Sequence, residues 1–250
     1  YERMQKGRGR EHFQWNVDIL GTNEISDDAE LFSVLTTFLE GVGLTEEDVV
    51  IRVSSRKVLE EVLGALGITG DLFAKTCIIV DKIDKLSPEV IDEQLTELGH
   101  DSKVISTIQS TLGLKHLNSL KKVLKLDSAA LSELTQLFEA IDAYGISNWV
   151  EFDASIVRGL AYYTGSVFEV NDRKGKFRAI CGGGRYDKLL STLGGKDLPA
   201  TGFGFGDMVI IELLKDKGLI PHLLSGVEDV VIALDPNLKN IAVKVASVLR

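Results

Sequence analysis

Strand-forming segments near both ends of the chain are separated by one long helical stretch, and this order constrains the fold more than any other feature. Residues 71–144 are rich in Leu, Lys, Glu, Asp and Ser, and their apolar positions recur every three or four residues, as at Leu134, Phe138 and Ile141. The segments on either side carry strand and turn signals instead. The sequence therefore predicts an antiparallel sheet that is interrupted by a helical insertion and then resumed.

Hydrophobic spacing and turn-forming residues place the remaining elements. We expect helices over residues 27–41, 56–66, 208–214 and 238–249, and strands over 49–54, 149–153, 166–170, 177–181, 201–206 and 227–234. The first 21 residues are predicted to form a β-hairpin around Gly7 and Gly9, with an inward face made by Phe13, Trp15, Val17 and Ile19. The predicted class is α+β, with a last β-α unit that is too small to be stable alone.

Composition and charge exclude several classes of protein. Hydrophobic residues make up 44% of the chain and charged residues 26%, as in a soluble globular protein, and no apolar run approaches the roughly 20 residues that cross a bilayer. Cys77 and Cys181 lack metal-ligand spacing, so neither a disulfide scaffold nor a zinc finger is expected, and a reducing compartment is favoured. The net charge of −9 argues against an extended basic surface for nucleic acid.

The first of three polar segments lies in the predicted hairpin. Charged residues surround its glycine turn, among them Glu2 and Arg8, and Gln14 and Asp18 follow on the second arm, four positions apart. Residues i and i+4 of a strand share a face, so Gln14 and Asp18 are expected on the same side of the sheet. Guanidinium groups can bind a polyphosphate, and a carboxylate with an amide can recognise an amine and a polar side chain. Alone, a basic hairpin is more often a solvated surface.

Two further segments flank a predicted strand. RGLAYYTG occupies residues 158–165, and CGGGRYD occupies residues 181–187, at the end of an expected strand. Three successive glycines expose backbone N–H groups and remove side-chain bulk, which suits a ligand lying against the sheet, although the spacing of a Walker loop is absent. Paired tyrosines are usually packing elements, and a glycine run is usually a flexible turn. The order of the three segments is more specific than any one of them.

Together the three segments resemble a known family. YERMQKGRGREHFQWNVDILG resembles motif 2 of the class II aminoacyl-tRNA synthetases, and RGLAYYTGSVFE followed by CGGGRYD is similar to the two histidine-binding signatures of the histidyl-tRNA synthetases. The resemblance covers nearly the whole chain. It implies a catalytic domain over residues 1–70 and 145–222, a helical insertion domain over 71–144 and the start of an α/β anticodon-binding domain over 226–250. It also implies a fragment that begins within motif 2 and lacks motif 1.

The resemblance assigns expected roles to individual residues. Arg158 would reach the α-phosphate of ATP as the catalytic residue, while Glu2 would contact the adenine and Arg8 the phosphates. The residues expected to bind histidine are Gln14, Asp18, Tyr163 and Tyr186, with Asp18 facing the α-amino group and the tyrosines lining the imidazole pocket. Further pocket candidates are Gly183, Gly184, Arg185 and Gly204. Mg²⁺ would bridge the pyrophosphate oxygens of the nucleotide, and no metal site made of protein side chains is expected.

The resemblance also implies an activity and a setting for the parent protein. It would join histidine to tRNA(His) through a histidyl-adenylate intermediate and would work as a homodimer. Neither DNA nor a membrane is expected as a partner, and the expected location is the cytoplasm or the interior of a chloroplast or mitochondrion. Because motif 1 is missing, the piece itself is expected to have little activity.

Two departures from the family pattern keep other functions open. The family has Glu where Asp18 stands, and residues 202–209, GFGFGDMV, lack the arginine with which most class II enzymes bind the γ-phosphate of ATP. Either ATP is bound differently here or that contact is lost. One alternative is a catalytically silent paralogue that regulates histidine biosynthesis or senses uncharged tRNA. Another is an RNA-binding module whose contacts come from Lys115, His116, Lys121, Lys122 and Lys125.

Overall fold

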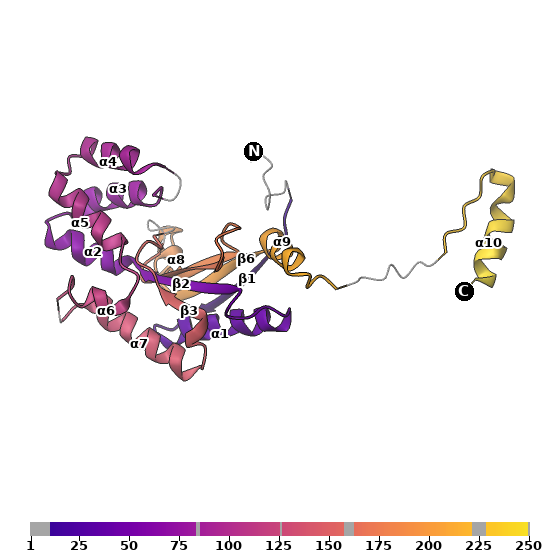
Figure 1. The fold of residues 1–250 in the computed structure, drawn as a ribbon, viewed down its shortest axis with the longest axis horizontal. Coiled ribbons are helices and arrows are strands. Elements are labelled where there is room, and N and C mark those ends of the chain that lie inside the picture. Colours follow the sequence, from indigo (N-terminus) through magenta and orange to yellow (C-terminus); the bar gives the residue numbers. More distant parts are fainter. Residues whose placement is uncertain (1–10, 84–85, 126, 158–162, 222–228, 250) are drawn as a thin grey trace.

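A six-stranded sheet with helices packed around it forms the body of the molecule (Figure 1). The computed structural model describes residues 11–83, 86–125, 127–157, 163–221 and 229–249. The strand order is β1-β6-β5-β4-β2-β3. In chain order the strands are β1 (Gln14–Leu20), β2 (Val49–Ser55), β3 (Val150–Phe152), β4 (Ser166–Asp172), β5 (Cys181–Arg185) and β6 (Ala200–Gly206).

All strand pairs are antiparallel except one. β2 and β3 run parallel, with Ile51 opposite Val150, so the prediction of an antiparallel sheet is wrong at this edge. The physical reason is the connection: the chain leaves β2, passes through helices and comes back in the same direction, as a parallel pair requires. On its other side, β2 pairs with β4, and this pair is antiparallel, from Val49 opposite Asp172 to Ser55 opposite Ser166.

Helices occupy most of the remaining described chain. They are α1 (Ser26–Gly41), α2 (Arg56–Ala65), α3 (Gly70–Val80), α4 (Pro88–Glu97), α5 (Ser102–Leu112), α6 (Leu117–Leu120), α7 (Ala129–Ala143), α8 (Leu189–Thr192), α9 (Asp207–Lys217) and α10 (Lys239–Val248), with short 3₁₀ turns at Ser147–Trp149 and Pro236–Leu238. The four individually predicted helices are confirmed as α1, α2, α9 and α10 within a few residues. None of the helices in the described residues is long and apolar enough to cross a membrane.

Side-chain caps explain where several helices begin. The hydroxyl of Ser55 accepts a hydrogen bond from the N–H of Lys57 at the start of α2, and the hydroxyl of Ser128 accepts one from Leu131 at the start of α7. The carboxylate of Asp101 accepts one from Val104 at the start of α5. Each cap satisfies a backbone donor that has no partner within the helix, which favours helix formation at that point.

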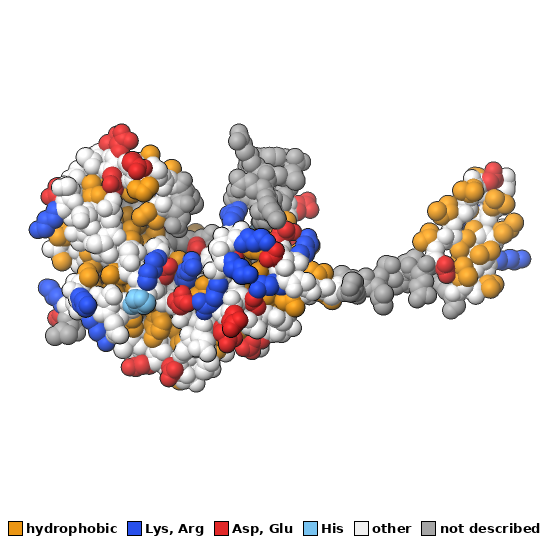
Figure 2. Space-filling view, in the orientation of Figure 1, with side chains coloured by type: hydrophobic (Ala, Val, Ile, Leu, Met, Phe, Trp, Pro, Cys, Tyr) orange, Lys and Arg blue, Asp and Glu red, His pale blue; other side chains and the backbone are white. Residues whose placement is uncertain are grey.

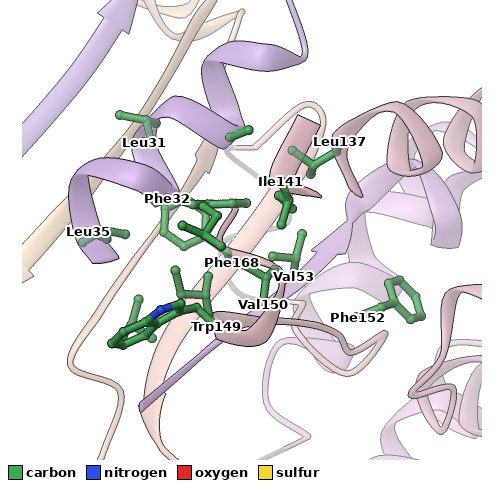
Figure 3. Packing of buried hydrophobic residues seen from close by; sticks show 14 of the residues in the cluster. Leu31, Phe32, Leu35, Val53, Leu137, Ile141, Trp149, Val150, Phe152 and Phe168 are labelled. Atoms are coloured by element: carbon green, nitrogen blue, oxygen red, sulfur yellow. The ribbon is translucent and has the colours of Figure 1, made fainter. Parts of the chain in front are cut away.

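The main hydrophobic core lies between one face of the sheet and helices α1 and α7 (Figure 3). Phe32 of α1 meets Phe168 of β4 edge to face, with ring centroids 4.7 Å apart. Leu137 and Ile141 bring α7 onto the same layer. Because both helices cover this face, the opposite face of β1, β6 and β5 is left to form a site.

A second hydrophobic cluster lies among the helices that follow β2. Its buried members come mostly from α2 to α5 and include Leu59, Leu63, Phe73, Leu95 and Ile108. Thus α2 packs on both sides: Val58 and Val62 join the sheet core, and Leu59 and Leu63 join the second cluster. By contrast, α7, which lies within the predicted insertion 71–144, packs on the sheet. The exact limits of the insertion remain a prediction.

Both cysteines are buried, and they lie in different hydrophobic clusters. Cys77 lies in the second cluster, where burial raises the pKa of its thiol to about 11. Near it, the hydroxyl of Thr76 lies 2.7 Å from Nε2 of the buried His100. These residues therefore have structural roles inside the helical unit.

Three strand predictions need correction. The strand expected at 177–181 begins only at Cys181 and runs through the glycines to Arg185, because the carboxylate of Asp172 accepts hydrogen bonds from the N–H groups of Lys176 and Phe177 and holds that segment as a turn. Phe13 is 84% exposed and lies just before β1, outside the inward face. The described part of the strand predicted at 227–234 is not a strand.

The last correction has a simple physical cause. A strand needs a partner for its backbone groups, and residues 229–234 have none among the described residues. They and α10 lie apart from the sheet in Figure 1, and apolar side chains such as Ile232, Leu234 and Val248 are exposed there (Figure 2). The first arm of the predicted hairpin lies outside the described residues.

Candidate active site

Alternation along three strands gives the sheet two different faces. Trp15 and Val17 of β1 and Phe203 and Phe205 of β6 face the core, and the Trp15 ring lies 5.4 Å from that of Phe203. The residues between them face the other way and are Gln14, Asn16, Asp18, Gly202 and Gly204, with Gly182 and Gly184 in register on β5. This second face therefore combines a polar strand with a floor of glycine.

The glycines are needed for close approach. A Cβ atom added to Gly202 would lie 2.1 Å from Oδ1 of Asp18, and one added to Gly204 would lie 2.6 Å from Nε2 of Gln14. Both distances are far shorter than van der Waals contact. The polar side chains of β1 can therefore lie flat over β6 only because β6 carries no side chains there.

A hollow of about 180 Å³ lies over this floor. It is lined by Gln14, Asn16, Asp18, Tyr163, Tyr186, Gly202, Phe203 and Gly204. The structure thus brings together all four residues that were predicted to bind histidine, from β1 and from the segments next to β4 and β5. That these residues bind histidine remains a prediction.

Hydrogen bonds order the side chains of the hollow. The hydroxyl of Tyr186 donates to the carboxylate of Asp18, and Nε2 of Gln14 donates to Oδ1 of Asn16 at 2.6 Å. A carboxylate, two amides and a phenol can together accept hydrogen bonds from an ammonium group and from a ring N–H. The site is therefore suited to a small polar ligand that carries a positive charge.

Asn16 is a lining residue that the sequence analysis missed. Its position midway between Gln14 and Asp18 places it on the same face of β1, and this alternation was the available signal. Gly204 lines the hollow as expected, and Gly184 lies on the same face of the sheet. By contrast, Gly183 and Arg185 lie on the core face of β5, because neighbouring residues of a strand point to opposite sides.

Arg185 is buried beneath the site rather than exposed in it. Its guanidinium pairs with the carboxylate of Asp28 in α1, with Nη2 and Oδ2 3.0 Å apart, and the hydroxyl of Thr201 donates to the other oxygen of Asp28 at 2.5 Å. Burial raises the pKa of Asp28, although the Arg185 charge and these hydrogen bonds act in the opposite direction. Arg185 thus makes its contacts inside the protein and not in the hollow.

A second hollow adjoins the first. It has a volume of about 220 Å³ and is lined mainly by apolar side chains of residues Leu20, Leu189, Leu190, Leu198 and Ala200. Asp18 and Tyr186 line both hollows, so their hydrogen bond forms the wall between them. The polar hollow is therefore bounded by an apolar one on this side.

The residues expected to bind ATP cannot be placed in the same way. Glu2, Arg8 and Arg158 lie outside the described residues. Residues 202–209, which lack the family's γ-phosphate arginine, form most of β6 and the start of α9. There the carboxylate of Asp207 accepts a hydrogen bond from the N–H of Phe13 at 3.2 Å. This contact ties the beginning of β1 to the end of β6.

Of the basic residues expected to contact RNA, one is paired with an acidic side chain and three others are exposed. Acidic and basic side chains are interspersed on the face shown in Figure 2. Nζ of Lys115 lies 2.6 Å from the carboxylate of Asp153, so this lysine has an internal partner. Lys121, Lys122 and Lys125 are exposed in the described structure.

The mostly antiparallel sheet and its glycine-floored polar hollow define the catalytic domain of a class II aminoacyl-tRNA synthetase. A solved structure has the same fold: histidyl-tRNA synthetase from Nostoc sp. aligns with a TM-score of 0.73 and 26% identity over 95% of this chain and 58% of that one. A Bacillus halodurans protein titled as an ATP phosphoribosyltransferase regulatory subunit/histidyl-tRNA synthetase aligns with a TM-score of 0.66 and 25% identity, over 81% of this chain and 52% of that one.

The particular family follows from the sequence comparisons. The family described as histidyl-tRNA synthetase matches residues 2–207, and the chain belongs to it. The histidine–tRNA ligase, chloroplastic/mitochondrial, of Arabidopsis thaliana is 52% identical over 250 residues, which are 100% of this chain and 51% of that protein. The ligase of Opitutus terrae is 41% identical over 90% of this chain and 53% of its own length. The chain thus spans about half the length of these relatives.

Proposed function

We propose that this chain is the amino-acid-binding part of a histidine–tRNA ligase, which joins histidine to tRNA(His) through a histidyl-adenylate. The single observation that carries the proposal is the meeting of Gln14, Asp18, Tyr163 and Tyr186 over one glycine floor. Family membership and 52% identity to a histidine–tRNA ligase support it.

The first step requires that histidine and ATP be aligned, and it depends less on acid–base catalysis. The carboxylate of histidine is already ionised at neutral pH, so it needs no general base to attack the α-phosphate of ATP. Negative charge then grows on the non-bridging oxygens of that phosphate, and a planar guanidinium can meet two of them at once. We assign this role to Arg158, and ATP binding to Glu2 and Arg8, on the strength of the family motifs.

Selection of histidine would come from the polar lining of the hollow. Asp18 carries the charge that an ammonium group requires, and we assign it to the α-amino group, with the two tyrosines around the imidazole. A site built to hydrogen-bond a polar group rejects analogues without that group by about 10⁴ or more. Apart from Asp18 and Tyr186, which line both hollows, the second hollow is lined by apolar side chains, and this favours the polar hollow as the amino-acid site.

We infer that Mg²⁺ would bind together with the nucleotide. The described residues contain no group of three or more His, Cys, Asp or Glu side chains that could hold a metal ion. Mg²⁺ that binds with a nucleotide needs only one or two protein carboxylates besides the phosphates, so such a cluster is not required.

The remaining parts of the proposal concern the whole protein. We infer a homodimer, an insertion domain near residues 71–144, an anticodon-binding domain that starts near residue 226, and work in the cytoplasm or inside an organelle. The name of the Arabidopsis relative supports an organelle.

Histidine-dependent exchange between ATP and pyrophosphate, measured on the full-length parent protein, tests the function. We expect exchange that depends on histidine. Histidine binding without exchange would contradict the proposal and favour the catalytically silent paralogue, which the Bacillus halodurans title makes the relevant alternative.

A further inference from the structure

Arg185 lies directly below the floor of the amino-acid hollow. It is 6% exposed, and it follows Gly184 and precedes Tyr186 along the chain. Because successive residues of a strand point to opposite faces, the Arg185 side chain runs toward α1 while Tyr186 points into the hollow. A buried charge is costly unless it is paired, so an arginine is kept here only with dedicated partners.

The guanidinium holds the chain that leaves β1. Nη1 donates to the carbonyl oxygen of Thr22 at 3.2 Å, and Nη2 donates to that of Glu24 at 2.9 Å and to the Asp28 carboxylate at 3.0 Å. Thr22 and Glu24 come just after the strand that carries Gln14 and Asp18. The planar fork of donors reaches all three oxygens at once, which the single ammonium of lysine cannot do in the same geometry.

The main chain of Arg185 holds the segment that carries Tyr163. The N–H of Thr164 donates to the carbonyl oxygen of Arg185 at 2.7 Å, and the Thr164 hydroxyl donates to the carboxylate of Asp187 at 2.8 Å. The side chain of Arg185 also passes close to Gly165, where an added Cβ would lie 3.2 Å from its Cδ. Tyr163 is therefore anchored through its next residue.

These contacts give Arg185 a role that extends beyond stability. We propose that Arg185 is a positioning residue, which fixes the relative positions of Asp18, Tyr163 and Tyr186 by bonding to each of the three segments that carry them. The proposal rests on the proposed function, because its readout is histidine use. A displacement of about 1 Å in a binding constellation can cost about a hundredfold in rate.

The test is the variant R185K in the full-length protein, measured by histidine-dependent ATP–pyrophosphate exchange. Lysine keeps the charge for Asp28 but loses the two carbonyl contacts after β1. We expect the KM for histidine to rise about tenfold or more, while the KM for ATP stays within about twofold; neither KM depends on the active fraction. T201V is the matched control: it removes the hydroxyl bond to the same carboxylate and leaves the bonds of Arg185 to Thr22 and Glu24.

The outcomes separate positioning from stability. A merely structural role would lower Tm and the active fraction in both variants without changing the KM for histidine, and that result would overturn the proposal. An equal rise in the KM for histidine in T201V would overturn it too. If R185K cannot be purified, R185Q combined with D28N removes both buried charges together, and the same shift in the KM for histidine is expected. Absence of histidine-dependent ATP–pyrophosphate exchange in the unmodified protein would instead contradict the proposed function.

Discussion

The hydroxyl of Tyr186 donates a hydrogen bond to the carboxylate of Asp18, which lies 168 positions earlier in the chain. The bond joins β1 to the end of β5 across β6 and closes the polar hollow on one side. The bond uses one of the two carboxylate oxygens of Asp18, Oδ1. Residues from distant parts of the sequence thus line one hollow.

Removing this hydroxyl should weaken histidine binding. Y186F keeps the ring and loses the hydrogen bond to a charged group, which is worth about 1.5–3 kcal/mol when fully formed. Because Asp18 is exposed without a ligand, we expect the lower end, or about a tenfold rise in the KM for histidine in the exchange assay. The control Y144F alters an exposed tyrosine at the end of α7 and should leave that KM unchanged. Equal effects of the two substitutions would argue against a role for Tyr186.

The glycine floor makes a second prediction with a control on the same strand. The methyl group of G202A would lie 2.1 Å from Asp18 Oδ1 and 2.7 Å from the carbonyl oxygen of Val17, so both Asp18 and the backbone of β1 must move. We therefore expect the KM for histidine to rise at least tenfold and the Tm to fall. In G206A the added methyl meets nothing within 4 Å, and histidine use should be normal. Normal histidine use in G202A would show that Asp18 does not have to lie over β6.

Two exposed lysines that follow α6 allow a test of RNA contact. Lys121 and Lys122 are exposed just after α6, and the charge reversals K121E and K122E together should raise the KM for tRNA in aminoacylation by the full-length protein. The slope of log affinity against log salt should also fall by about one per lost phosphate contact. K75E combined with K103E makes the same change in net charge on exposed residues of α3 and α5 and is the control. Unchanged tRNA affinity in K121E/K122E would remove these lysines from the RNA-binding surface.

The lowered pKa of Asp153 predicts that the stability of the protein depends on pH. Burial alone would raise the pKa of Asp153, but hydrogen bonds from Lys115 and Ser155 outweigh it and hold the pKa below its ordinary value. A carboxyl group with a lowered folded pKa contributes stability above its unfolded pKa of about 3.9, and this contribution is lost as the pH falls through the folded pKa. The Tm of D153N should therefore lie below that of the unmodified protein at neutral pH, and the gap should narrow under acid conditions. A gap that stays constant down to low pH would contradict this assignment.

Local patterns predicted much of the fold. The helical spacing of Leu31 and Leu35 predicted α1, and the alternation of Trp15 and Val17 placed Gln14 and Asp18 on one face of β1. Pairing between distant segments left less trace in the sequence. The parallel join of β2 and β3 depends on a crossover of many residues, which spacing along one strand does not reveal.

Two features of the site were not predicted correctly: the face on which Arg185 lies and the place of Asn16. A run of glycines has low strand propensity and was therefore interpreted as lying at a strand end, although β5 passes through all three of these glycines. A Cβ added to Gly183 would lie 2.1 Å from the carbonyl oxygen of Gly202 in β6, and one added to Gly184 would lie 2.3 Å from that of Ser166 in β4. With the strand placed about four residues too early, the face on which Arg185 lies was not determined. Asn16 was not singled out, although it lies within the quoted motif 2 segment and its place between Gln14 and Asp18 indicated the same face.

The most direct test of the account is a structure of the full-length protein with a bound, non-hydrolysable histidyl-adenylate analogue. We predict that the imidazole lies within hydrogen-bond distance of Tyr163 or Tyr186, over the floor made by Gly202 and Gly204, with the guanidinium of Arg158 facing the α-phosphate. An imidazole bound elsewhere, or an Arg158 side chain that points away from the phosphate, would contradict it.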